Sequence, residues 1–186
     1  MNLKKAIIPF LLASAGILSV SGAYASDGTI TFNGNIIAST CKPDGGPADL
    51  TVTLPPVSTT ALGEAGKTAG RTPFNLMLTG CATTEGNPTK VAVTFEAGPS
   101  VNQSTGRLTV DAGTSEAPGA KNVEVQVLND QQQPVKVGAA GDQGSQIVDI
   151  GADGKAKMDY YAEYMATGAA GAGAVNTRVQ YSLSYQ

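Results

Sequence analysis

The two cysteines, Cys41 and Cys81, are the side chains of this chain that could most readily do chemistry. They could form a disulfide, bind a metal ion or take part in redox exchange. A metal site or a redox site is disfavoured because the chain contains no histidine and no Cys-x-x-Cys motif. Because residues 1–25 have the form of a secretory signal peptide, as described below, a disulfide between them is the default expectation. Closing a loop of this length should contribute about 3 to 4 kcal/mol in the chain-entropy model.

Catalytic constellations do not appear elsewhere in the sequence. Without histidine there is no Ser-His-Asp or Cys-His arrangement, and no paired carboxylates or phosphate-binding glycine loop stand out. The segment from Asp149 to Gly154 weakly resembles a calcium loop, but it lacks the Asp-x-Asp-x-Asp-Gly spacing and the distal glutamate. It therefore predicts a turn. We expect no enzyme activity, no cofactor and no metal.

The first 25 residues have the form of a secretory signal peptide. Lys4 and Lys5 precede an apolar run over residues 6–20, and Ala23-Tyr24-Ala25 is an A-x-A cleavage site. Cleavage would leave 186 − 25 = 161 residues starting at Ser26, which suits one domain. Removing two lysines leaves 10 basic and 15 acidic residues, a net charge of −5, so nucleic acid is not an expected partner.

Short alternating segments separated by turn residues dominate the rest of the chain. One helical turn is expected near residues 61–65, and no longer stretch has a helical period. This pattern predicts an all-β protein, an antiparallel β-sandwich. The predicted strands cover residues 50–54, 74–78, 91–96, 107–110, 123–127, 134–137 and 146–150, followed by a tyrosine-rich segment at 158–166 and a closing strand within 175–186.

Residues 28–40, just before Cys41, form the most strongly patterned stretch near the N-terminus. Ile30, Phe32, Gly34 and Ile36 fall on one face of a period-two ribbon, and polar residues fall on the other. Asn33-Gly34 is also a signal for a hairpin turn, but a two-residue loop there would mix apolar and polar side chains on both faces. A continuous strand is favoured, with Gly34 facing a close neighbour.

The C-terminal stretch alternates in the same way. Val179, Tyr181, Leu183 and Tyr185 lie on one face, and the chain stops directly after them. Such a terminal strand needs a partner along its edge, because an uncovered edge is a template for aggregation.

Taken in order, these motifs make the chain similar to the fimbrial subunits (pilins) of the chaperone-usher route in Gram-negative bacteria, especially the type 1 major-subunit group. The resemblance covers the whole chain. It rests on Gly28-Thr29-Ile30-Thr31-Phe32-Asn33-Gly34, the 40-residue cysteine spacing, Pro73-Phe74-Asn75-Leu76-Met77-Leu78-Thr79-Gly80-Cys81, Ala166-Thr167-Gly168-Ala169-Ala170 and the closing Val179-Gln180-Tyr181-Ser182-Leu183-Ser184-Tyr185-Gln186.

The resemblance implies an incomplete immunoglobulin-like sandwich that lacks its last strand. Residues 1–25 would be the signal peptide, 26–40 an N-terminal donor-strand arm and 41–186 the pilin domain. A periplasmic chaperone would lend the missing strand, and the arm of the next copy would replace it at the outer-membrane usher. Ile30, Phe32, Gly34 and Ile36 would be the groove-facing arm residues. The C-terminal motif would comprise Gly173, with Gly171 as the alternative glycine, and Val179, Tyr181, Leu183 and Tyr185.

The predicted product is a head-to-tail homopolymer, also joined to other fimbrial subunits, that forms a pilus rod on the cell surface and supports adhesion.

Other interpretations of the sequence remain. The first strand could pack into its own domain, and the isolated chain could fill its own groove with its arm. The chain could also be a minor adaptor or a tip subunit that binds a host glycan or receptor, for which Tyr160, Tyr161 and Tyr164 could form a sugar-stacking surface.

Overall fold

The computed structural model describes residues 29–34, 36, 41–44 and 49–186. The predicted signal peptide lies outside these residues. The chain divides into two units, Met1–Ile36 and Ile37–Gln186, and all regular structure described below belongs to the second. Its elements are β1 (Lys42–Pro43), the 3-10 helix η1 (Thr59–Leu62), β2 (Thr68–Thr79), β3 (Lys90–Phe95), β4 (Val101–Asn102), β5 (Arg107–Thr109), β6 (Lys121–Leu128), β7 (Ile147–Asp149), β8 (Ala156–Gly171) and β9 (Tyr181–Tyr185).

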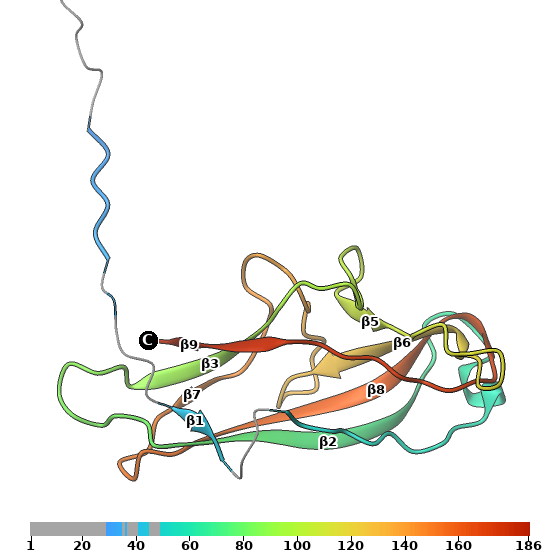
Figure 1. The fold of residues 1–186 in the computed structure, drawn as a ribbon, viewed down its shortest axis with the longest axis horizontal. Coiled ribbons are helices and arrows are strands. Elements are labelled where there is room, and N and C mark those ends of the chain that lie inside the picture. The colour runs from blue at the N-terminus through green and yellow to red at the C-terminus, as the bar shows by residue number, and fades with distance from the viewer. Residues whose placement is uncertain (1–28, 35, 37–40, 45–48) are drawn as a thin grey trace, which may run out of the picture. The chain divides into compact units, whose positions relative to one another are not determined.

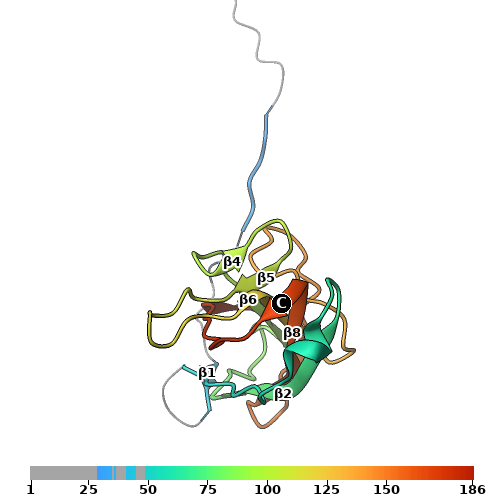
Figure 2. The same ribbon diagram turned by 90° about the vertical axis from the view of Figure 1, so that its right-hand side faces the viewer.

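Two antiparallel sheets make up this unit (Figure 1). The larger has six strands in the order β1-β2-β8-β6-β5-β4, and the end-on view of Figure 2 shows β4, β5, β6, β8 and β2 following one another across it. The smaller has three strands in the order β7-β3-β9. The prediction of an all-β protein is thus confirmed.

The hydrophobic core draws on both sheets. Leu78 of β2, Met158 and Tyr160 of β8 and Val91 of β3 are almost fully buried within one cluster. The Tyr160 ring stacks on Phe74 at 5.6 Å between centroids and meets Phe95 of β3 edge-on at 5.4 Å. Since edge-on and offset contacts suit the ring quadrupole, this aromatic group joins the two sheets.

Five of the expected strands correspond to β2, β3, β5, β6 and β7. β2 begins six residues before the predicted start, and β8 extends the tyrosine-rich segment to 16 residues, because the two pair with each other along most of their lengths. The expected helical turn is η1. The Asp153-Gly154 pair lies in a turn as predicted, with Gly154 at a φ of +71°.

Two predicted strands were wrong. Residues 50–54 belong to no strand in the described structure, although Val52 and Leu54 are half-buried against the core. Val135 and Val137 are buried as their alternation suggests, but this segment makes only one bridge, between Leu128 and Pro134. The chain then turns away, with the amide of Val137 bonded to the carbonyl of Gly106. In both segments the apolar side chains of the alternating pattern pack against the core, but no strand ladder forms.

Candidate functional site

A disulfide joins Cys41 to Cys81, with the two Cα atoms 4.0 Å apart. Directly after Cys41, β1 pairs with the end of β2, Lys42 opposite Thr79 and Pro43 opposite Leu78. A proline is tolerated here because β1 is an edge strand. The predicted bridge is confirmed, and it holds the start of this unit against the end of β2.

The N-terminal stretch presents its apolar side chains to solvent. Ile30 is 80% exposed, Phe32 is 89% exposed and Ile36 is 104% exposed. A Cβ added to Gly34 would meet no atom within 4 Å. Residues 29–34 adopt no strand or turn, since a strand requires a hydrogen-bonded neighbour. Neither the continuous strand nor the hairpin is therefore formed in the described part of this stretch, and Gly34 has no close neighbour there.

The C-terminal strand β9 lies at the edge of the three-stranded sheet. It pairs with β3 in register, Tyr181 opposite Phe95, Leu183 opposite Val93 and Tyr185 opposite Val91. These three side chains are half-buried, while the intervening serines are exposed. The strand begins later than the predicted segment, because β3 ends at Phe95 and just beyond it only the carbonyl of Gln180 accepts a hydrogen bond, from the amide of Glu96. Val179 lies outside the strand but is half-buried on the same core.

A second segment also carries half-buried apolar side chains. Val52 and Leu54, from the stretch predicted as a strand, and Val57, which follows it, pack against the core. Burial, the larger cause, and the charge of Asp49 both raise the pKa of Tyr181. The segment of residues 52–57 and the stretch from Val179 to Tyr185 thus both place half-buried apolar side chains against the same core.

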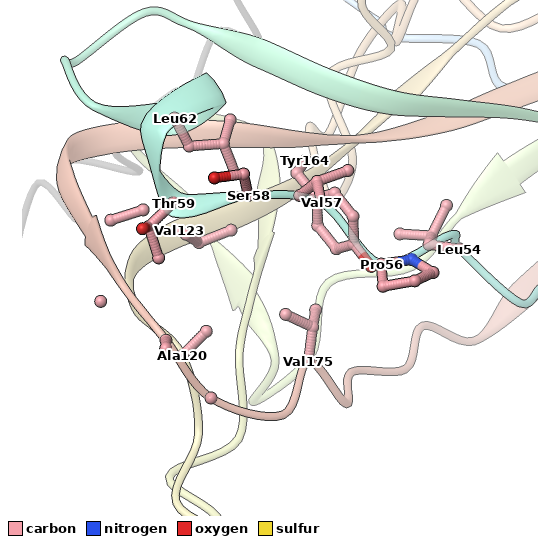
Figure 3. Close-up of a pocket in the computed structure, with 14 residues that line it drawn as sticks. Leu54, Pro56, Val57, Ser58, Thr59, Leu62, Ala120, Val123, Tyr164 and Val175 are labelled. Carbon is pink, nitrogen blue, oxygen red and sulfur yellow. The ribbon is translucent and has the colours of Figure 1, made fainter.

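An apolar pocket of about 440 Å³ lies between Leu54 and Val57 of the first segment and the chain that leads toward β9 (Figure 3). One wall carries Val57 and Pro56, and Val175 faces them from the chain that leads into β9. Small residues leave the space open. The pocket is lined by Leu54, Pro56, Val57, Ser58, Thr59, Leu62, Ala120, Val123, Tyr164, Ala170, Gly171, Ala172, Gly173 and Val175. We call this space the apolar pocket; the sequence patterns identified Gly171, Gly173 and Tyr164 but not the pocket itself, because its walls come from distant segments.

The two candidate motif glycines have different surroundings in this pocket. A Cβ on Gly173 would lie 2.5 Å from the backbone nitrogen of Ala120 and 2.7 Å from the carbonyl oxygen of Pro118. A Cβ on Gly171 would meet mainly the Lys121 side chain, at 3.2 Å. The 3.2 Å contact, with the Cβ of Lys121, needs only a small shift, whereas contacts under 3.0 Å with backbone atoms cannot form without moving the chain. Gly173 is therefore the position at which two chain segments need glycine.

The tyrosines of β8 are not arranged as a sugar-stacking surface. Tyr160 is fully buried and Tyr164 is 8% exposed, so only Tyr161 of the three is accessible in part. Burial raises the pKa of both Tyr160 and Tyr164, and the hydroxyl of Tyr160 lies 2.8 Å from that of Ser145. Within the described residues no group of acidic or cysteine side chains could hold a metal ion.

Comparison with known proteins identifies the family. The model of type-1 fimbrial protein A matches residues 54–186. The chain belongs to the type-1 fimbrial protein A family. It is therefore a structural subunit of a surface fimbria and not an enzyme. No helix among the residues described is long and apolar enough to cross a membrane.

Relatives and solved structures agree with this assignment. The major fimbrial subunit SMF-1 of Stenotrophomonas maltophilia is 46% identical over 168 residues, covering 88% of this chain and 95% of its own. The F17 fimbrial protein of Escherichia coli is 39% identical over 183 residues, covering 96% and 98%. The crystal structure of the P pilus rod subunit PapA matches with a TM-score of 0.59 at 23% identity, covering 80% of this chain and all of that one. The fold is that of a pilin, an incomplete immunoglobulin-like sandwich.

Proposed function

We propose that this fimbrial subunit polymerises head to tail by donor-strand exchange. Residues 26–40 would form the donor arm, residues 41–186 the pilin domain that accepts a neighbour's arm, and residues 1–25 a signal peptide removed on export. The observation that carries the proposal is the exposure of Ile30, Phe32 and Ile36 in the isolated chain. Three large apolar side chains on one face of a short ribbon favour an external partner.

The acceptor site would comprise the free edge of β9 and the apolar pocket, with Val179, Tyr181, Leu183 and Tyr185 along the edge and Gly173 at the pocket. β9 pairs with β3 on one edge, and an inserted arm would form a ladder on the other. Gly34 would allow close backbone approach at the centre of the arm. Burying Ile30, Phe32 and Ile36 would contribute about 5 to 9 kcal/mol before entropy is counted. Such an arm should dissociate slowly.

The geometry of this contact suits a fibre. The donor and the acceptor are different surfaces of the same chain, so each copy uses one and offers the other. A heterologous contact that does not close on itself generates an open helical filament. The partners are therefore further copies of this chain and, at the ends of the rod, other fimbrial subunits.

Assembly also requires temporary protection of the acceptor site. An apolar strand edge exposed during export would promote aggregation. We assign this protection to a periplasmic chaperone that lends a strand to the site, and the exchange of that strand for the next arm to an outer-membrane usher. Both roles follow the mode of β-strand addition used by chaperones and pilins.

The chain is proposed to be the major rod subunit rather than a minor adaptor. Its similarity to a major fimbrial subunit over nearly the whole of both chains supports this choice. Mass spectrometry of sheared pili would count its copies per fibre. A rod subunit should be present in large excess over every other subunit, whereas a copy number near one would identify an adaptor or a tip subunit.

Two tryptophan substitutions on opposite faces of the arm test donor-strand exchange. Gly34→Trp should abolish the ladder of oligomers that survives mild heating in detergent, because the ring would block close approach at the acceptor edge. Thr31→Trp adds the same bulk to the polar face and should leave the ladder intact. Deleting residues 26–35 should act like Gly34→Trp. A normal ladder from the Gly34→Trp variant or from the deletion would overturn the proposal.

A further inference from the structure

The apolar pocket is backed by an irregularity in the large sheet. The β2–β8 ladder runs through Ala69 opposite Tyr164 and resumes at Thr72 opposite Ala162. Two residues of β2, Gly70 and Arg71, therefore stand opposite the single residue Glu163. Gly70 has a φ of +71°, so this is a β-bulge that begins with a left-handed glycine.

The backbone of this bulge lies against the wall of the pocket. A Cβ added to Gly70 would be 2.9 Å from two ring carbons of Tyr164 and 3.3 Å from a methyl carbon of Val57. Both of these side chains line the apolar pocket. Figure 3 shows them next to each other on one side of it. The position of the Gly70 backbone therefore limits where Tyr164 and Val57 can sit.

An ion pair on the opposite face of the sheet joins the two sides of the bulge. Nε of Arg71 donates to Oε2 of Glu163 at 2.8 Å. The Glu163 side chain is only 3% exposed, whereas that of Arg71 is 41% exposed and also donates to Gln132. A buried carboxylate needs such a partner, since an unpaired charge there is costly.

Glu163 is held from its other side as well. Its second oxygen accepts a hydrogen bond from Nε2 of Gln126 at 2.9 Å. Oε1 of Gln126 in turn accepts from Nε of Arg107, whose guanidinium pairs with Glu124 at 3.4 Å. Glu124 and Gln126 alternate along β6 with Val123, Val125 and Val127 of the core, so the network lies on the outer face of the sheet. Glu163 is thus a fixed anchor for Arg71.

We propose that Arg71 and Glu163 are positioning residues of the acceptor site, whose ion pair holds the Gly70 bulge and thereby sets the wall of the apolar pocket formed by Tyr164 and Val57. This rests on the proposed role of that pocket in receiving a donor arm. Bulges often re-aim side chains next to functional sites. Neither residue would touch the arm, so their effect would be indirect.

Glu163→Gln tests this role with Glu124→Gln as a matched control. Both substitutions replace a buried carboxylate of the same network by an amide of the same shape, but Glu124 lies in a regular part of the ladder. The full mature chain carrying Gly34→Trp supplies the acceptor, and a fluorescent peptide of residues 26–40 supplies the donor. The readouts are the dissociation rate of the peptide and the NMR shifts of the Val57 methyl groups without peptide.

Glu163→Gln should raise the dissociation rate by about tenfold and move the Val57 methyl signals, whereas Glu124→Gln should leave both nearly unchanged. Arg71→Lys keeps the charge at an accessible position but loses the planar fork, so it should give a smaller change in the same direction. Equal effects of the two glutamine variants, or an unchanged rate with Glu163→Gln, would overturn the proposal. If the acceptor that carries only Gly34→Trp failed to bind the peptide, the proposal of donor-strand exchange would fail instead. Unchanged Val57 methyl shifts in the Glu163→Gln variant would still refute the positioning role.

Discussion

β8 and β9 carry the same kind of alternating tyrosine pattern, yet they occupy opposite situations in the fold. β8 is paired on both edges, with β2 and β6, and its Tyr160 is fully buried. β9 lies at a sheet edge beside β3, and its Tyr181 is half-buried. The same pattern therefore belongs to the core where strands pair on both sides, and stays half-buried where one edge is open. The number of neighbouring strands, rather than the pattern, distinguishes the scaffold from the edge that we propose as the acceptor site.

Truncating one leucine of β2, the strand that pairs with β8, and one of β9 should sharpen this contrast most strongly. Leu78→Ala removes a fully buried β2 side chain and should lower the free energy of unfolding by about 2 to 5 kcal/mol, whether the acceptor site is empty or filled. Leu183→Ala in β9 should cost about 1 kcal/mol in the lone chain, because its side chain is only half-buried.

Binding of a donor peptide at the acceptor site should change the cost of Leu183→Ala but not that of Leu78→Ala. With the peptide of residues 26–40 bound, the cost of Leu183→Ala should rise to about 2 kcal/mol or more, since the donor completes its burial. Urea unfolding of the Gly34→Trp chain with and without peptide measures both. If the Leu183→Ala cost did not depend on the peptide, β9 would be scaffold like β8.

The two pocket glycines provide the next test. Gly173→Ala should destabilise the chain by about 1 to 3 kcal/mol, because its Cβ would press on the backbone of residues 118–120. The amide of Ala120 and the carbonyl of Ala174 are hydrogen-bonded at 2.8 Å, so these segments cannot separate freely. Gly171→Ala is the control and should change stability by less than about 0.5 kcal/mol. If urea unfolding gave the same decrease in the free energy of unfolding for Gly173→Ala and Gly171→Ala, the close approach at Gly173 would not shape the site.

Alkaline pH should produce the smallest difference between the two strands. Burial is the main cause that raises the pKa of both Tyr160 and Tyr181. A phenol whose pKa is higher in the folded state contributes stability below its ordinary pKa of about 10, and this contribution is lost as pH rises through the folded value. Unfolding free energies measured from pH 8 to 11 should therefore fall above about pH 10.

Phenylalanine substitutions assign that fall to individual residues. Tyr160→Phe should cost about 1 kcal/mol near neutral pH, through loss of the contact with Ser145, and should make the alkaline fall shallower. Tyr181→Phe should flatten the fall less in the lone chain, because β9 is only half-buried. A larger effect from Tyr181→Phe would reverse the proposed order of burial.

Local patterns in the sequence were sufficient for much of this architecture. Alternating residues placed β2, β3, β5, β6 and β7, and the cysteine spacing together with the export signal predicted the disulfide. Pairing was harder to predict. Residues 50–54 and 134–137 have the apolar alternation of strands but lack a ladder, since pairing depends on a neighbour that the local sequence does not specify.

The sequence by itself determined the two apolar ribbons at the ends of the chain, the cysteine pair and the family to which they belong, because each is encoded by residue type and short-range spacing. Only the tertiary structure decided which tyrosines are core, that β9 lies at an edge, and that Gly173 rather than Gly171 meets backbone. It alone brought Gly70, Tyr164 and Val57 together behind the pocket. These features depend on contacts between residues far apart in the chain, and such contacts exist only once the sheets have formed.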